Sequence, residues 1–260
     1  MDQDYPNFEL IVVDDGSSDN SVAVIDSFKK KFPEIVVVKL KKNMGICKAF
    51  NNAFKISRGE FLIDLAADDV LLPNRISRGV EVFHGLVEDY GVLFGDAEWI
   101  DEKGFHLNFH SDRFPHNSVP RGDIYKDLVE RYFICSPTMM FRRTVIDCMN
   151  GYDESLTYED FDFWIRSSRR FKYEYDPEVL VKKRKVLNSL SHEQFKILNR
   201  HSLSTYRVCV KVLALNKSME ERRATGQRLQ YEIRQSIRTL NISLAFQYIL
   251  LWIRNNSMRY

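Results

Sequence analysis

Two pairs of neighbouring aspartates follow apolar stretches of the chain. Asp14 and Asp15 come directly after LIVV, and Asp68 and Asp69 come shortly after the apolar run FLI. Carboxylate oxygens are the ligands that Mg²⁺ and Mn²⁺ prefer, and at phosphate sites these ions use one or two carboxylates. A carboxylate can also accept hydrogen bonds from a nucleobase or a ribose hydroxyl. Helix capping explains one such pair, so spacing alone leaves capping and a nucleotide-and-metal site both open.

A third acidic cluster lies among aromatic residues in YDESLTYEDFDFW, at 152–164. If residues 159–171 are helical, Asp160 lies in the first turn, where the helix dipole stabilises a carboxylate without any further role. The other interpretation is a general base, because apolar rings beside a carboxyl group raise its pKa. Glu159 precedes Asp160 and belongs to the same candidate site.

The elements that must position these carboxylates alternate between strand and helix. Apolar runs and turn residues predict strands at 8–13, 34–40, 59–66 and 90–101, and helices at 17–32, 46–57 and 159–171. This order predicts an α/β domain with a mainly parallel sheet. Such sheets bind ligands beyond the carboxyl ends of their strands, where both aspartate pairs are expected.

Length and composition are those of an ordinary globular protein. A chain of 260 residues, 44% hydrophobic and 28% charged, suits one or two domains. The four cysteines are too scattered for a zinc site or a disulfide framework, which favours a reducing compartment such as the cytoplasm. No signal peptide is expected after Met1, and the longest uncharged apolar run, 242–253, is too short to span a bilayer.

Charge divides the chain into an acidic body and a basic tail. Residues 1–181 carry a net charge of −10, whereas 182–260 carry 16 Lys and Arg against 4 Asp and Glu, a net +12. The tail is expected to be helical, with an apolar stripe at Ile233, Ile237, Leu240, Leu244, Tyr248 and Leu251. It either packs on the acidic body or contacts an anionic membrane surface, to which each basic residue contributes roughly 1 kcal/mol.

Four segments in series carry a family resemblance. They are PNFELIVVDDGSSDNS, NMGICKAFNNAF, RGEFLIDLAADDVLLPNRI, and SPTMMFRRTVID followed by GYDESLTYEDFDFWIR. In this order and spacing they resemble the family 2 glycosyltransferases of GT-A fold, from about residue 5 to 181. The resemblance implies a GT-A domain, Rossmann-like with a mainly parallel sheet, at 1–181, and a basic helical extension at 182–260. It also implies sugar transfer from a nucleotide-sugar, most often a UDP-sugar, to a glycan or lipid-linked acceptor in cell-surface polysaccharide or glycolipid synthesis.

The resemblance assigns three residues to the donor site. Asp15 resembles the residue that accepts a hydrogen bond from the uracil ring, and Asp14 beside it is a further candidate for the nucleotide site. Lys48 either supplies a positive charge for the diphosphate, in place of the family's arginine, or is a surface lysine. Asp68 and Asp69 occupy the family's DxD-type site, which shares ribose contact and metal coordination. Asp69 is the first choice for Mn²⁺ or Mg²⁺, with Asp68 as the second ligand.

The resemblance also assigns the base. Asp160 resembles the residue that takes the proton from the acceptor hydroxyl, and Glu159 lies next to it. A metal ion would stabilise the charge on the leaving diphosphate. A single base with direct displacement implies inversion of configuration, unlike the two-carboxylate scheme of retaining glycosidases.

Four features depart from the family's pattern. Ala66 stands where many relatives have the first carboxylate of DADD, and Phe50 where many have an arginine. His192 is the candidate for a further histidine ligand that some relatives place after the base. The family's first strand, of the type SVIIPTYN, has no counterpart before Tyr5, and we therefore expect the chain to be truncated at its front.

These departures support a second hypothesis, a truncated or degenerate module that binds nucleotide without turnover. A sugar-nucleotide pyrophosphorylase is disfavoured because no early Gly-rich loop with Arg and Lys appears, and a dehydrogenase because no GxGxxG follows a strand. No recognised nucleic-acid-binding motif is present, so no nucleic-acid partner is expected. We expect a metal-dependent enzyme in the cytoplasm, peripheral to the inner face of the membrane.

Overall fold

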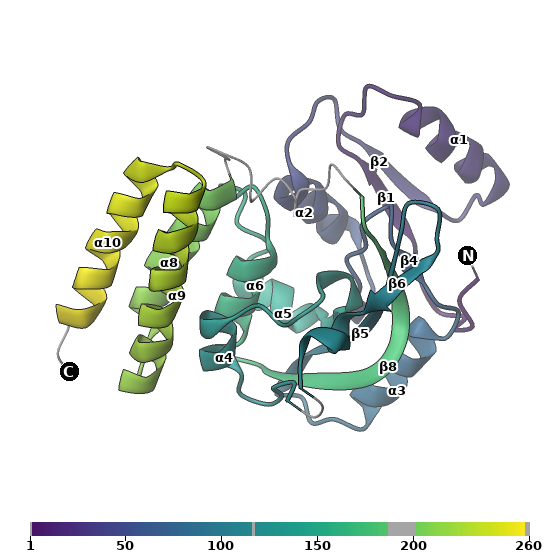
Figure 1. The fold of residues 1–260 in the computed structure, drawn as a ribbon. Coiled ribbons are helices and arrows are strands. Elements are labelled where there is room, and N and C mark those ends of the chain that lie inside the picture. The colour runs from purple at the N-terminus through teal and green to yellow at the C-terminus, as the bar shows by residue number, and fades with distance from the viewer. Residues whose placement is uncertain (1, 116–117, 187–200, 258–260) are drawn as a thin grey trace.

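The computed structural model describes residues 2–115, 118–186 and 201–257, which form an α/β body and a helical tail (Figure 1). The first half of the body contains β1 (Ile11–Asp14), α1 (Ser21–Lys31), β2 (Val36–Lys39), α2 (Ile46–Ile56), β3 (Phe61–Leu62), β4 (Val70–Leu71), α3 (Arg75–His84) and β5 (Tyr90–Ile100). The second half contains β6 (His106–Phe109), η1 (His110–Arg113), α4 (Tyr125–Glu130), η2 (Ser136–Thr138), β7 (Met140–Arg142), α5 (Arg143–Met149), α6 (Asp160–Ser167) and β8 (Lys172–Arg184). The tail contains α8 (His201–Leu215), α9 (Met219–Arg238) and α10 (Ile242–Ser257).

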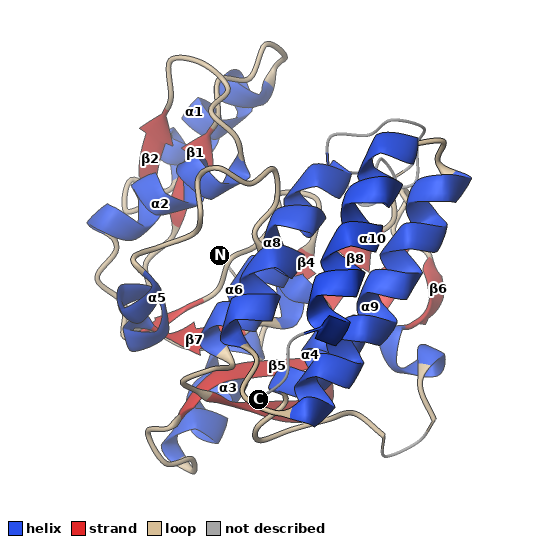
Figure 2. Ribbon diagram, turned by 90° about the vertical axis from the view of Figure 1, so that its left-hand side faces the viewer, coloured by secondary structure: helices blue, strands red, loops and turns tan. Residues whose placement is uncertain are grey.

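The strands of the body form two sheets. β1 and β2 are parallel, with Ile11 opposite Val36, and the larger sheet has the order β3-β7-β5-β8-β4, with β6 paired to β5. β5 and β8 are parallel along their length, whereas the other described pairs of the larger sheet are antiparallel. The α/β class is confirmed, but the sheet is mixed rather than mainly parallel, because the short strands β4, β6 and β7 run against the long pair (Figure 2).

The strand expected at 59–66 is mostly loop. Only Phe61 and Leu62 pair with β7, opposite Arg142 and Phe141. After β3 the chain turns, and the N–H of Asp69 donates to the carbonyl of Ala66 at 3.2 Å. Asp68 and Asp69 therefore lie in the turn between β3 and β4, not at the end of a long strand.

Helix α6 lies between the sheet and the tail helices, and its side chains enter the core on both sides. Phe161 and Phe163 are completely buried. The Phe163 ring lies 5.1 Å from that of Phe141 in β7, and the Phe161 ring lies 4.5 Å from the guanidinium carbon of Arg228 in α9. Because burying an aromatic side chain stabilises by roughly 1.5–3 kcal/mol, the start of α6 is held from both sides.

The basic tail packs on the acidic body through ion pairs. Lys211 of α8 bonds Asp153 at 2.6 Å and the buried Asp162 at 2.5 Å. Arg169 pairs with Glu221 of α9 at 2.6 Å. These contacts fit the interpretation in which the basic tail packs on the acidic body. β8 crosses the boundary expected between residues 181 and 182, and that division into domains stays a prediction.

The predicted apolar stripe of the tail is split between two helices. The chain leaves α9 through Leu240, which has φ +57° and is 62% exposed, and α10 folds back beside α9 (Figure 1). Leu244, Tyr248 and Leu251 are buried as expected, whereas Ile237 is exposed. Within the described ranges, none of the helices combines the length and the apolar character that crossing a bilayer requires.

Candidate active site

A buried carboxylate and a glycine shape the loop after β1. Asp14 is only 4% exposed, and its two oxygens lie 3.3 and 3.4 Å from the N–H of Ser17, which donates to them. Gly16 has φ +74°, a region open to glycine at little steric cost. A Cβ there would lie 2.5 Å from the carbonyl carbon of Lys42. The loop therefore packs against the chain that precedes α2, and Asp14 supports the loop from inside.

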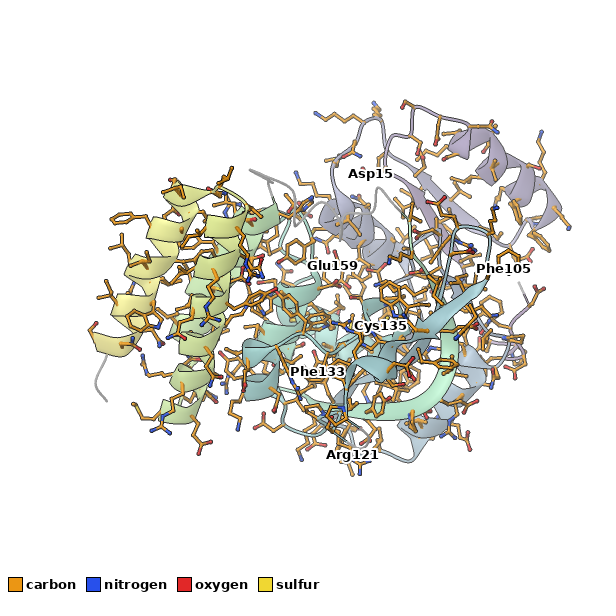
Figure 3. All side chains as sticks on the ribbon, viewed as in Figure 1. Asp15, Phe105, Arg121, Phe133, Cys135 and Glu159 are labelled. Carbon is orange, nitrogen blue, oxygen red and sulfur yellow. The ribbon has the colours of Figure 1, made fainter. Side chains whose placement is uncertain are left out.

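Asp15 connects this loop to the start of α2. Its Oδ1 accepts from the N–H of Met44 at 2.7 Å and its Oδ2 from the N–H of Gly45 at 2.8 Å. Gly45 is the N-cap of α2, and Lys48 follows in the first turn, partly exposed. The structure thus brings Asp15, which follows Asp14 at the end of β1, to the start of α2, whose first turn carries Lys48; Figure 3 labels Asp15. A nucleobase that donates a hydrogen bond to Asp15 would bind a carboxylate that already accepts hydrogen bonds from two backbone N–H groups.

Arg184 at the end of β8 holds the Asp68–Asp69 turn. The N–H of Arg184 donates to Oδ1 of Asp69 at 2.8 Å, and its guanidinium donates to the carbonyl of Asp68 at 3.0 Å. Burial raises the pKa of Asp69, although the Arg184 N–H and the charge of Lys183 act against this rise. The ammonium of Lys183 also lies 5.1 Å from the centre of the Trp99 ring. In the sequence, Lys183 belongs to the basic run 182–185, and no pattern indicated that it would lie near Asp69.

The Asp68–Asp69 turn fits a cation only together with an anionic ligand. In the part of the chain that the structure describes, no three His, Cys, Asp or Glu side chains are arranged to hold a metal. Asp68 is exposed, and Asp69 uses Oδ1 for Arg184, which leaves Oδ2 for another ligand. Mg²⁺ at phosphate sites needs only one or two carboxylates, because phosphates and water complete its shell. His192 lies outside the described residues.

Glu159 and Asp160 form a partly buried carboxyl pair at the start of α6. Glu159 is the N-cap and Asp160 the first helical residue, so Asp160 lies in the first turn as predicted, although the helix ends at Ser167 and not at 171. Oε2 of Glu159 and Oδ1 of Asp160 are buried, and neither has a hydrogen-bond donor among the described residues. Burial, followed by the charges of Asp160 and Asp64, raises the pKa of Glu159 well above its usual value. Such a strongly perturbed carboxyl group is typical of functional sites.

Asp64 is a further carboxylate of this cluster that sequence analysis missed. Its Oδ2 accepts a hydrogen bond from the phenol of Tyr152 at 3.2 Å. Burial and the charge of Asp160 raise the pKa of Asp64 to about 6, although the Tyr152 bond acts against this rise. The only signal in the sequence is an acidic residue inside an apolar run, FLIDL.

Tyr152 is itself fixed by helix α2. Asn51 donates to the Tyr152 carbonyl and accepts from its N–H, both at 2.9 Å. Phe50 stacks on the Tyr152 ring with centroids 4.0 Å apart. Phe50, noted above as a departure from the family's arginine, therefore supports the residue that binds Asp64.

The buried thiol of Cys135 is influenced by both the Asp68–Asp69 turn and the Glu159–Asp160 pair. Burial raises the pKa of Cys135 to about 12; the charge of Lys183 opposes this rise, and the charges of Asp69 and Asp160 add to it. Asp69 and Asp160 thus approach the same residue from different elements. Figure 3 labels Cys135, Glu159 and Asp15, with Asp15 uppermost of the three in this view.

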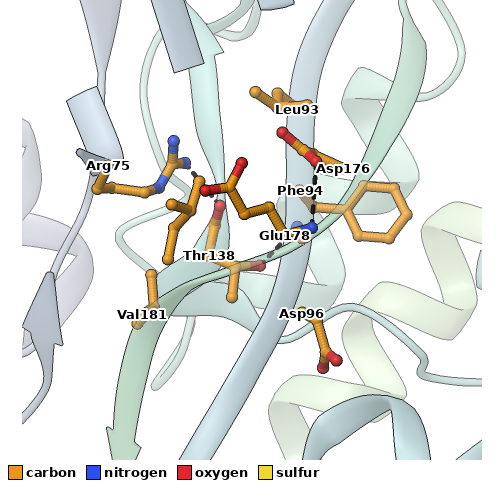
Figure 4. A pocket seen from close by; sticks show the side chains of 10 residues that line it. Arg75, Leu93, Phe94, Asp96, Thr138, Asp176, Glu178 and Val181 are labelled. Carbon is orange, nitrogen blue, oxygen red and sulfur yellow. Dashed lines mark hydrogen bonds between the residues drawn. The ribbon is translucent and has the colours of Figure 1, made fainter. Parts of the chain in front are cut away.

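A small cavity lies elsewhere, between α3 and the β5–β8 pair. Its volume is about 10 Å³, the size of a single water molecule. The buried guanidinium of Arg75 donates to the carbonyl of Thr138 at 2.8 Å, and Asp176 lines the same space (Figure 4). Burial lowers the pKa of Arg75 to about 10, and the charge of Asp176 opposes this fall. This cavity is too small for a nucleotide and belongs to the packing of the sheet.

A family model described as Glycosyl transferase family 2 matches residues 1–149. The chain belongs to glycosyltransferase family 2. Two relatives, both called uncharacterised glycosyltransferases, are 28% identical to it. That of Rickettsia typhi aligns over 70% of this chain and 56% of its own length, and that of Methanocaldococcus jannaschii over 67% and 59%. This family 2 chain therefore spans less than two thirds of these relatives.

Solved structures agree with the GT-A fold that the sequence predicts. Residues 1–349 of TarS from S. aureus, in complex with UDP-GlcNAc, match 98% of this chain and 72% of that one, with a TM-score of 0.66 and 19% identity. The mannosyltransferase PcManGT from Pyrobaculum calidifontis, in complex with GDP-Man and Mn²⁺, matches 98% of this chain and 80% of that one, with a TM-score of 0.58 and 13% identity. At these identities the likeness shows the fold.

Proposed function

We propose that this chain is an inverting glycosyltransferase that moves a sugar from a UDP-sugar to an acceptor hydroxyl. The observation that carries the proposal is the Glu159–Asp160 pair, in which one oxygen of each carboxyl group is buried without a hydrogen-bond partner among the described residues, in a chain of family 2. Two structural neighbours, solved in complex with UDP-GlcNAc and with GDP-Man, support a nucleotide-sugar donor. We also propose that the acceptor belongs to a cell-surface polysaccharide or glycolipid.

Asp160 is the base in this proposal. Its carboxylate takes the proton of the acceptor hydroxyl while that oxygen attacks the anomeric carbon of the donor. The bond from the anomeric carbon to the diphosphate oxygen breaks, and the nucleoside diphosphate leaves with the electron pair. One base and one displacement give inversion of configuration.

The donor lies across the loops that carry the other candidate residues. Asp15 and Lys48 contact the nucleotide near the start of α2, and Asp68 and Asp69 hold Mn²⁺ or Mg²⁺ together with the diphosphate. When bound, the metal neutralises charge on the leaving diphosphate. Lys183 supplies a fixed positive charge beside Asp69, as its effect on the pKa of Asp69 indicates.

Calorimetric titration of UDP with and without Mn²⁺ tests the donor site. We expect metal-dependent binding that Asp69→Ala abolishes and that Asp147→Asn, a change at an exposed residue of α5, preserves. Binding that ignores both Mn²⁺ and Asp69→Ala would overturn the metal assignment. An absence of UDP binding under any condition would overturn the donor proposal.

A second candidate function is nucleotide binding without turnover. Ala66 and Phe50 favour it, because each replaces a charged residue of many relatives. Hydrolysis of a UDP-sugar panel separates the two candidates. Metal-dependent sugar release that falls by about a thousandfold in Asp160→Asn is the loss expected for a general base, and it supports the enzyme. UDP binding with no release of any sugar supports the binding module.

We further propose that the tail places the protein at an anionic membrane surface on the cytoplasmic side. Helix α10 contains no acidic residue, and Ile242, Phe246, Leu250 and Ile253 are all more than half exposed on it. Sedimentation with vesicles of zwitterionic or mixed zwitterionic and anionic lipid tests this. Phe246→Glu should weaken binding to the anionic vesicles, while Phe105→Glu, at an exposed position outside the tail, should not. Sedimentation that is the same with both vesicle types would overturn the proposal.

A further inference from the structure

The segment that leads into the candidate base runs along one face of the tail helix α8. Three of the hydrogen bonds between them are those from the N–H of Thr157 to Oγ of Ser204 at 2.9 Å, from the guanidinium of Arg207 to the carbonyl of Ser155 at 2.6 Å, and from the ammonium of Lys211 to Oδ2 of Asp153 at 2.6 Å. Positions 204, 207 and 211 are three and four residues apart, so they share one face of the helix. The segment and α8 therefore run side by side in opposite directions.

Helix α2 contacts the same segment at other residues. Sγ of Cys47 lies 3.6 Å from the carbonyl oxygen of Leu156, and the side chain of Asn51 bonds the backbone of Tyr152. The first residue before α2 is also the one whose N–H donates to Asp15. A helix of the donor half and a helix of the tail thus hold the approach to α6 together.

Lys211 reaches both ends of this approach. Its Nζ bonds Asp153 and also lies 2.5 Å from Oδ1 of Asp162, so one ammonium group holds a residue before Asp160 and a residue after it. Asp162 is 1% exposed, and its other oxygen accepts from Nε of Arg166 at 2.7 Å. Charge-assisted hydrogen bonds of this kind are about twice as strong as those between neutral groups. The turn from 153 to 162 is therefore closed by a bridge that comes from the tail.

Asp160 depends on its backbone for its position. Its Oδ1 is buried, and this atom has no hydrogen-bond donor among the described residues. The residues on either side must therefore determine where the oxygen lies. A displacement of about 1 Å in a reacting group can lower a rate by about a hundredfold. The bridge through Lys211 is thus placed where it can control the candidate base.

We propose that Lys211 is a positioning residue of the candidate active site: it ties Asp153 and Asp162 to α8 and thereby sets the place of Asp160 between them. Lys211 acts through the backbone of 153–162 and not on the substrate. The first helix of the tail then belongs to the catalytic centre as well as to the packing of the body. The inference rests on the proposed function for the role of Asp160 as base, but the placement itself can be tested without turnover.

Hydrogen exchange of the full chain, read by mass spectrometry, tests the placement. In Lys211→Met, the amides of 153–163 should exchange at least about fivefold faster than in the unchanged chain, and this rise should exceed any rise in α9 and α10. Lys55→Met, at an exposed position of α2, should change neither region. Unchanged exchange at 153–163 would overturn the proposal. An equal or larger rise in α9 and α10 would overturn it too, because that result describes detachment of the tail.

Hydrolysis of a UDP-sugar supplies a second test as a double-mutant cycle. Lys211→Met should lower kcat by at least about tenfold and leave the donor KM unchanged, because the base is displaced and the donor loops are not. In an Asp160→Asn background the same change should lower kcat by less than about twofold, since no base is left to displace. A loss of folded protein, in contrast, lowers the rate by equal factors in both backgrounds. Equal factors would therefore overturn the proposal.

Asp153→Asn keeps the test decisive if Lys211→Met does not fold. It removes one charge of the bridge at a partly exposed side chain and leaves the bond from Lys211 to Asp162 in place. The same pattern is expected with a smaller factor, about threefold in kcat, again only when Asp160 is present. An unchanged kcat would overturn the proposal. If no UDP-sugar is hydrolysed by the unchanged chain, the proposed function fails, and hydrogen exchange still decides whether Lys211 places the segment.

Discussion

The phenol of Tyr152 donates a hydrogen bond to Oδ2 of Asp64 at 3.2 Å, and this bond links the loop after β3 to the segment that leads into α6. Both partners have shifted pKa values, with that of Asp64 raised to about 6 by burial and the charge of Asp160. The two residues are 88 positions apart in the chain, so the bond connects segments that are distant in sequence.

The pH dependence of stability follows from Asp64. Its pKa is about 6 in the folded chain and 3.8 in its ordinary state, so the folded protein binds more protons between these values. Its contribution to stability is present below about pH 4 and is lost as the pH rises through 6. Asp64→Asn should therefore raise the free energy of unfolding at pH 8, by at most about 3 kcal/mol. At pH 4 the difference should be small.

Thermal and urea unfolding of both proteins at pH 4 and pH 8 measure this difference. Asp147→Asn is the matched control, because Asp147 is exposed. If Asp64→Asn lowered the free energy of unfolding equally at both pH values, the side chain of Asp64 would stabilise the fold regardless of its charge. That result would contradict the prediction that the ionised form destabilises the folded chain.

Removal of the Tyr152 hydroxyl should lower the free energy of unfolding, whereas Asp64→Asn should raise it. Tyr152→Phe takes away the hydrogen bond that lowers the pKa of Asp64, so the carboxylate would lose its one recorded donor. A buried acceptor without a partner costs about 1–3 kcal/mol. We expect that loss of unfolding free energy at pH 8, and a smaller loss at pH 4, where Asp64 is protonated more often. Urea denaturation at the two pH values checks this, and a larger loss at pH 4 would contradict it.

Gly16→Ala should open the loop that supports Asp14 and Asp15. The added Cβ would lie 2.5 Å from the carbonyl carbon of Lys42, in backbone with φ +74°. Overpacking and strain of this kind cost about 1–3 kcal/mol each. We expect a loss of roughly 3 kcal/mol in unfolding free energy together with weaker UDP binding.

Gly104→Ala is the matched control for that change. Gly104 has φ +92°, but a Cβ there meets no atom within 4 Å. It should show the cost of positive φ alone, with UDP binding intact. Equal losses in the two variants would mean that the contact with Lys42 relaxes without cost.

Lys211→Met should weaken the attachment of the tail to the body. Lys211 bonds Asp153 and the buried Asp162, and breaking a buried pair typically costs about 3–5 kcal/mol. Burial alone would raise the pKa of Asp153, but the Lys211 hydrogen bond and further donors outweigh it and lower that pKa to about 2. This part of the stabilisation is present above about pH 4 and is lost as the pH falls through 2.

Denaturant unfolding of Lys211→Met at pH 7 and at pH 3 measures the effect. We expect the larger loss at pH 7. Lys55→Met, at an exposed position of α2, controls for the change of side chain. A loss that is the same at both pH values would assign the effect to Asp162 alone.

Local sequence patterns predicted the first half of the fold well. β1, α1, β2 and α2 lie within about four residues of their expected positions, because each is an apolar run or an amphipathic stretch between turn residues. The start of α6 at Asp160 was also predicted, since an acidic residue before an aromatic run is a helix-start signal.

The remaining features depend on contacts between distant segments. The apolar run 59–66 predicted a strand that included Asp64. No local pattern indicated that Tyr152 would donate a hydrogen bond to the Asp64 carboxylate. The directions of β3, β4 and β7 follow from their partners, not from their own residues. Lys183 was counted with the basic tail because its run of charges continues into 185, although β8 carries it to the Asp68–Asp69 turn.

Arg184 is both the last residue of β8 and the anchor of two loops, since its guanidinium also donates to the carbonyls of Asp101 and Glu102. A chimera that exchanged the helical tail between family members at residue 181 would cut this strand and replace the anchor. Grafts should therefore be joined after Lys185, where the last backbone bond of β8 to Ile100 is complete. In this chain the natural unit of recombination is longer than the acidic body that its charge pattern outlines.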